Sequence, residues 1–94
     1  MSVAETIRAK LTAALAPQVL DVVDESRRHA GHAGSRPEGE THFRVTIVAA
    51  AFEPMARLER HRCINTILAT ELAGPVHALA LSTLTPAEAA ARRS

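Results

Sequence analysis

The sequence predicts an α+β fold in which helices cover a three-stranded mixed sheet, with elements in the order α-β-β-α-α-β-α. The clearest observation is the stretch 41–48, where apolar and polar side chains alternate with the period of a strand that has one buried face. The second is a helical pattern over residues 58–73, which stops at Gly74-Pro75. The third is the length of 94 residues, 47% of them hydrophobic, which suits a single small domain over residues 1–94.

The first helix is predicted over residues 3–16. Ser2 and Glu5 have the spacing of a capping box, and apolar side chains recur behind them at helical spacing. A short β-branched run at residues 19–23 then predicts the first strand. Its apolar character is too continuous to assign its two faces.

A long surface loop is predicted to follow, with its main part at residues 27–39. The stretch 24–39 carries three glycines, one proline and almost no large apolar side chain. Loops of this length are uncommon in so small a domain and are usually either functional or disordered. The two loop histidines, His29 and His32, are therefore candidates for a functional site.

The third strand is predicted at residues 76–83, where alternation resumes after the helical stretch. Thr85 and Glu88 repeat the capping-box spacing, with Pro86 at the first helical position, so a short C-terminal helix should follow. Residues 91–94 are expected to fray. The first two strands can pair antiparallel, whereas the helical crossover suits parallel pairing of the second strand with the third.

Composition narrows the function classes. A net charge of +1 gives no strong field for nucleic acid, and a single cysteine cannot form an internal disulfide. No stretch has the length of a membrane span or a signal peptide, so we expect a cytoplasmic protein with no membrane partner. The sequence has no nucleophile elbow, phosphate-binding loop or HExxH motif, and we predict neither an enzyme nor a small-molecule substrate.

Five short segments, taken together and in order, resemble the BolA family. They are residues 22–26 (VVDES), 40–45 (ETHFRV), 60–62 (RHR), 76–81 (VHALAL) and 83–86 (TLTP). The resemblance spans about residues 17–88, the expected core, and departs from the usual pattern at Pro54, where a glycine is common. It implies a class II KH-like fold and two activities. One is partnership with a monothiol glutaredoxin in handling a [2Fe-2S] cluster; the other is DNA binding as a transcriptional regulator of stress response and cell morphology.

The resemblance implies histidine ligands for a shared cluster. It places one ligand at His77 and the second in the loop, where His29 and His32 both remain open. Imidazole nitrogen is a known ligand of [2Fe-2S] iron. Two histidines cannot hold a stable cluster alone, so we expect the partner to supply the remaining ligands, including glutathione. We interpret His42 as a strand-face residue and Cys63 as part of the core margin.

A basic surface near the start of the long helix is the candidate for DNA binding. Five side chains form it: Arg44, Arg57, Arg60, His61 and Arg62. A structural role is expected for Arg60, which lies near the apolar stripe, and phosphate contact for Arg62. The GxxG tetrapeptide that KH domains use occurs at residues 31–34, in the wrong loop for that mechanism. The cluster partnership therefore ranks ahead of transcriptional regulation.

Overall fold

The computed structural model describes residues 2–26 and 39–93, and the predicted architecture is confirmed. The elements in chain order are α1 (Val3–Leu15), β1 (Val19–Asp24), β2 (His42–Val48), the 3-10 turn η2 (Ala50–Phe52), α2 (Arg57–Ile67), α3 (Ala69–Ala73), β3 (Ala78–Leu84) and α4 (Pro86–Arg93). Most of the predicted loop, residues 27–38, lies outside the described residues, and so do His29 and His32.

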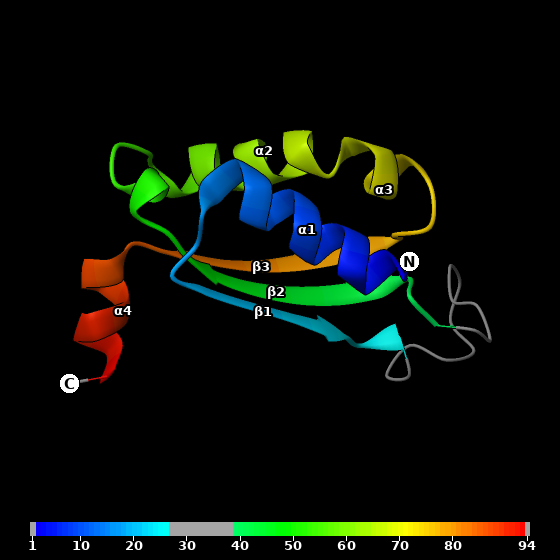
Figure 1. Ribbon diagram of the computed structural model, residues 1–94, viewed down its shortest axis with the longest axis horizontal. Helices are drawn as coiled ribbons and strands as arrows, with labels where there is room; N and C mark the ends of the chain where they lie inside the picture. Colours follow the sequence, from blue (N-terminus) through cyan, green and yellow to red (C-terminus); the bar gives the residue numbers. More distant parts are fainter. Residues whose placement is uncertain (1, 27–38, 94) are drawn as a thin grey trace.

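The sheet is mixed, with β2 in the middle of the order β1-β2-β3. β1 runs antiparallel to β2 with Val19 opposite Val48, and β3 runs parallel to β2 with Ala78 opposite His42. In Figure 1, α1 and α2 lie side by side over one face of the sheet, α3 continues from α2, and α4 lies beyond the end of β3. The helical layer and the sheet enclose the core.

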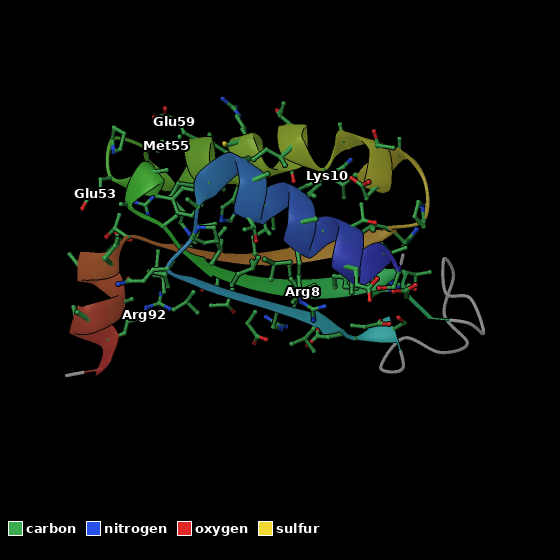
Figure 2. The ribbon with its side chains drawn as sticks, viewed as in Figure 1. Arg8, Lys10, Glu53, Met55, Glu59 and Arg92 are labelled. Carbon is green, nitrogen blue, oxygen red and sulfur yellow. The ribbon has the colours of Figure 1, made fainter. Side chains whose placement is uncertain are left out.

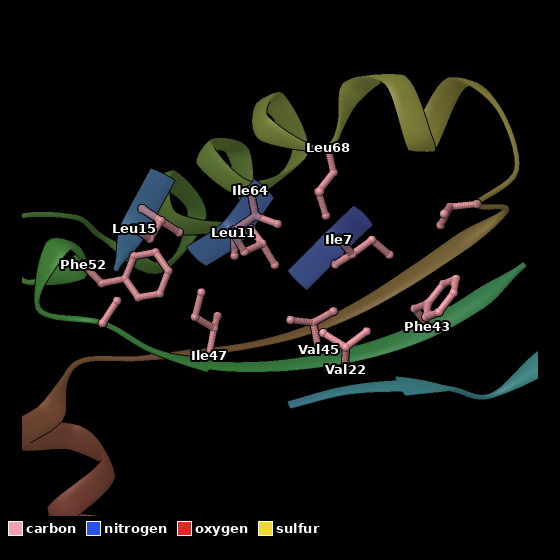
Figure 3. Packing of buried hydrophobic residues seen from close by; sticks show 12 residues of the cluster. Ile7, Leu11, Leu15, Val22, Phe43, Val45, Ile47, Phe52, Ile64 and Leu68 are labelled. Carbon is pink, nitrogen blue, oxygen red and sulfur yellow. The ribbon is translucent and has the colours of Figure 1, made fainter. Parts of the chain in front are cut away.

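Alternation in β2 decides which side chains enter that core. Phe43, Val45 and Ile47 point into the helical layer and are at most 2% exposed. They meet apolar side chains from α1, η2, α2 and the junction of α2 with α3, which Figure 3 shows gathered between the layers: Ile7, Leu11, Leu15, Phe52, Ile64 and Leu68. The opposite residues of β2 lie on the other face of the sheet. The core is therefore aliphatic apart from Phe43 and Phe52, which are the only aromatic residues of the Phe, Trp and Tyr type in the sequence.

The helical stretch predicted at 58–73 is interrupted at Leu68, a feature that the apolar pattern did not mark. Leu68 leaves helical geometry at φ −100° and ψ 20° while remaining 1% exposed. The change of direction brings Glu71 of α3 to Lys10 of α1, whose Nζ lies 2.9 Å from both carboxylate oxygens. The break thus lets the last helical turn close against the first helix.

The predicted start of the third strand was wrong. β3 begins at Ala78 rather than residue 76, because the Val76 amide donates to the Glu71 carbonyl at the end of α3 instead of joining the sheet. At the C-terminus α4 has helical geometry as far as Arg93, and the expected fraying of residues 91–94 stays a prediction. Alanine-rich sequence after a satisfied cap favours this extension.

Arg60 joins three elements from a buried position on α2. Its guanidinium donates to the Met55 and Thr83 carbonyls at 3.0 and 3.2 Å, and lies 5.7 Å from the centre of the Phe52 ring. It also donates to both carboxylate oxygens of Glu88 on α4, at 2.7 and 3.4 Å. Arg60 therefore has the structural role expected from its place near the apolar stripe.

Glu88→Gln should lower the free energy of unfolding at neutral pH. It should also make this free energy less dependent on pH in the acid range. The Arg60 guanidinium, followed by the Thr85 amide, lowers the pKa of Glu88 from 4.5 to about 2. Because the folded-state pKa is depressed, the stabilisation is complete above about pH 4.5 and is lost as pH falls toward 2. Urea unfolding at a series of pH values should show the two proteins converging over this window. Glu53→Gln, at an exposed site, is the control, and parallel curves for Glu88→Gln and the wild type would contradict the expectation.

Candidate functional site

His77 lies just before β3, at the end of the sheet where β2 begins. Its amide donates to the Thr41 carbonyl at 2.7 Å, and the Ala78 amide donates to the same oxygen at 3.1 Å. The His77 side chain is exposed. The parallel register therefore holds the backbone of His77 in place while leaving its imidazole accessible.

His42, the first residue of β2, lies beside His77. The two ring centres are 5.4 Å apart and the ring planes are tilted by 51°. His42 is only 7% exposed, and its Nδ1 shares a hydrogen bond of 2.8 Å with the Thr41 hydroxyl. That bond fixes the orientation of the inner ring, against which the outer ring of His77 rests.

The two ends of the predicted loop meet at the same end of the sheet. The Asp24 carboxylate accepts hydrogen bonds from the Ser26 amide at 2.9 Å, from the Ser26 hydroxyl, and from the Glu40 amide at 3.1 Å. The Ser26 hydroxyl also lies 3.4 Å from the Thr41 amide, which donates to it. We call these hydrogen bonds of Asp24 and Ser26 the anchor of the loop ends. Thr41 connects this anchor to His77, because its amide bonds to Ser26 and its carbonyl bonds to the His77 amide.

Gly39 is required at this anchor. Its φ of +78° is left-handed, and a Cβ there would lie 3.3 Å from the Ser26 hydroxyl and 3.4 Å from an Asp24 carboxylate oxygen. Burial raises the pKa of Asp24, but hydrogen bonds from Ser26 and Glu40 and the field of His42 outweigh it, so the pKa lies below 3.8. Asp24 is thus an anion that holds together the two ends of the segment containing His29 and His32.

His42 is the residue of this site that the sequence pattern did not reveal. It lies on the sheet face opposite Phe43, as expected, but its ring is buried against His77 rather than presented as an ordinary strand-face side chain. The available signal was a histidine near the start of each of two strands that were predicted to be parallel. Without the register, that signal could not show that the two histidines meet.

The candidate basic residues are distributed over different parts of the molecule. Arg44 lies on the face of the sheet opposite the helices and pairs with Glu25 at 3.0 Å. Arg57 and Arg62 are exposed on α2, in the helical layer, while Arg60 is buried beneath them. His61 is half-buried, and its Nε2 has no hydrogen-bond partner among the described residues. Arg57 and Arg62 are thus the two candidate arginines that are exposed on the same helix.

Within residues 2–26 and 39–93, no three His, Cys, Asp or Glu side chains converge in a way that would hold a metal ion. Over the same residues, no helix has the length and apolar character needed to cross a membrane.

Known proteins provide a comparison over most of the chain. A family model described as BolA-like protein matches residues 11–88. BolA-like protein 1 of Mus musculus is 55% identical over 82 residues, which are 87% of this chain and 57% of the mouse protein. The DNA-binding transcriptional regulator BolA of Escherichia coli K12 is 49% identical, over 90% of this chain and 77% of that protein. The solved BolA domain of SufE1 from Arabidopsis thaliana has a TM-score of 0.84 and 43% identity, covering 94% of this chain and 96% of that domain.

Asp24→Ala should release the anchored loop ends. Loss of a charge-assisted hydrogen bond of about 1.4 kcal/mol should speed amide exchange at Ser26 and Glu40 by about tenfold. Hydrogen exchange followed by NMR measures both amides. Asp21→Ala, which removes an exposed carboxylate from the same strand, should leave both rates unchanged. Unaltered protection of Glu40 in Asp24→Ala would contradict the role of the anchor.

Proposed function

Because this chain belongs to the BolA family, we propose that it is a non-enzymatic protein that partners a monothiol glutaredoxin and coordinates or transfers a shared [2Fe-2S] cluster. The observation that carries this proposal is the exposed imidazole of His77. Its ring lies beside the buried His42, and its amide is bonded to Thr41 at the anchored ends of the histidine-bearing loop. The chain spans 57% of the length of its mouse relative, so the activity and partners of such longer proteins are part of this proposal.

The donor chemistry of these residues fits the cluster. Imidazole nitrogen ligates iron in histidine-bound [2Fe-2S] centres, where the cluster supplies one-electron chemistry. His77 presents such a nitrogen at an exposed site, and His29 or His32 is the proposed second ligand from a segment whose ends are held nearby. The remaining ligands come from the partner and its glutathione. A reducing cytoplasm, where thiol ligands stay available, is the proposed setting.

His42 is a positioning residue in this proposal. Its Nδ1 is engaged by the Thr41 hydroxyl and its ring is buried, so it is poorly presented to a partner. Its ring rests against His77 and restricts the rotamers of that side chain. Groups that orient a metal ligand without touching the metal commonly alter affinity by a factor of ten or more.

Mixing the protein with a cluster-loaded monothiol glutaredoxin should change the visible circular dichroism. His77→Ala should abolish the change, because an imidazole ligand is lost while the exposed site tolerates a small residue. His42→Gln should weaken complex formation about tenfold without abolishing it. His61→Gln, which removes a histidine from α2 in the other layer, is the matched control and should behave as the wild type.

Single substitutions in the same assay distinguish which of the two loop histidines is the second ligand. If one of His29→Ala and His32→Ala reproduces the effect of His77→Ala, that residue is the second ligand. If both single variants are silent and the double variant is not, the two imidazoles replace each other. A wild-type spectrum that does not change on mixing would overturn the cluster proposal.

DNA-binding transcriptional regulation of stress response and cell morphology is the second candidate. It is favoured by the name of the Escherichia coli relative and by two exposed arginines on α2, Arg57 and Arg62. Guanidinium groups contact phosphates as paired donors, and binding of this kind is weak and salt-sensitive when few contacts are made.

Arg62→Ala should reduce duplex DNA binding at low salt and lower the slope of log K against log salt by about 1. Fluorescence anisotropy with a labelled duplex at several salt concentrations measures both quantities. Arg44→Ala is the matched comparison, because it removes one arginine from the opposite face of the sheet and should leave the slope unchanged. If Arg62→Ala also leaves the slope unchanged, Arg62 does not contact DNA.

A further inference from the structure

An open pocket of about 590 Å³ lies at the end of the molecule opposite His77, between the start of α2, the end of β3 and α4. Met55, just before α2, and Arg92 on α4 lie at this same end in Figure 2. The volume is within the range of pockets that hold small ligands. The cluster proposal does not involve this pocket. Of the two arginines in the DNA-binding proposal, Arg57 lines the pocket and Arg62 does not.

The charged groups of the pocket leave it with a positive character. Arg60 and Glu88 line it and form an ion pair at 2.7 Å, so their charges largely cancel. Arg57 and Arg92 line it from two different helices, and neither forms an ion pair with a described residue. Two guanidinium groups are therefore available at the pocket to an anionic ligand.

Thr83 supplies an independent indication of a ligand. It lines the pocket and is 6% exposed, yet its hydroxyl has no hydrogen-bond partner among the described residues. The backbone carbonyl of the same residue is already bonded to Arg60. A buried hydroxyl without a partner destabilises the fold, and a ligand atom that accepts its hydrogen bond removes that penalty.

We propose that this pocket binds a small molecule that carries one carboxylate on an apolar chain. Arg57 and Arg92 hold the carboxylate through paired N–H donors, and the Thr83 hydroxyl completes the polar contacts. Met55, Leu84 and Ala91 supply apolar lining for the chain. An anion without an apolar chain, such as inorganic phosphate, leaves this apolar lining without a contact.

Titration of the isotope-labelled full chain with hexanoate tests the proposal without glutaredoxin, cluster or DNA. Amide shifts should saturate and should cluster at Met55, Arg57, Thr83 and Arg92. Hexanol and inorganic phosphate, which lack the carboxylate and the apolar chain respectively, should each bind at least tenfold more weakly. Binding of either one as strong as that of hexanoate, or shifts that do not saturate, would overturn the proposal.

Variants separate ligand binding from stability. Arg57→Met combined with Arg92→Met should weaken hexanoate binding about tenfold or more. Thr83→Val should weaken it several-fold while the melting temperature stays the same or rises, because the substitution removes an unpaired buried hydroxyl. Arg62→Met, an exposed arginine of α2 outside the pocket, is the control and should bind as the wild type. Unchanged hexanoate binding in Thr83→Val and in the double arginine variant would overturn the assignment.

Discussion

Parallel pairing of β2 with β3 is the constraint on which both ends of the molecule depend. At one end, the Thr41 carbonyl accepts from the amides of His77 and Ala78, which sets His42 opposite Ala78. At the other end, the same register places Leu84 opposite Val48, and the Ala49 amide donates to the Leu84 carbonyl at 3.0 Å. A slip of one residue would turn Phe43, Val45 and Ile47 out of the core, so burial on one face protects the register.

Two arginines protect the outer strands of this small sheet. β1 and β3 are the outer strands, and outer strands expose unpaired peptide groups that invite association with other chains. Arg8 of α1 donates to the Val22 carbonyl on β1 at 3.3 Å, and Arg60 of α2 donates to the Thr83 carbonyl on β3 at 3.2 Å. Each helix thus covers its neighbouring strand with a charged donor, which satisfies the carbonyl and places a cation at the edge.

Local signals made most of the fold predictable. The capping box of Ser2 and Glu5 forms as expected, and Thr85 and Glu88 exchange the equivalent pair of hydrogen bonds. Such contacts join residues three apart, so a sequence pattern contains all of their information. The alternation of β2 is equally local, and it assigned the buried face correctly.

The features that escaped the sequence depend on contacts between distant segments. The meeting of His42 with His77 follows from strand register, which no single strand specifies. The break at Leu68 accompanies the pairing of Glu71 with Lys10, 61 residues apart in the chain. The ion partner of Arg60 is Glu88, 28 residues further along, so the helical pattern indicated a structural role for Arg60 without selecting Glu88.

The two proposed sites are separated by the length of β3. A strand of seven residues spans about 20 Å, with His77 just before its first residue and Thr83 next to its last. Both sites depend on the register of this strand, but they share no side chain. Substitution of an exposed side chain at one end leaves the ladder hydrogen bonds intact, and its effect should stay local because well-separated sites usually act additively. A change that alters both sites together therefore indicates damage to the pairing of β2 with β3 rather than a coupled function.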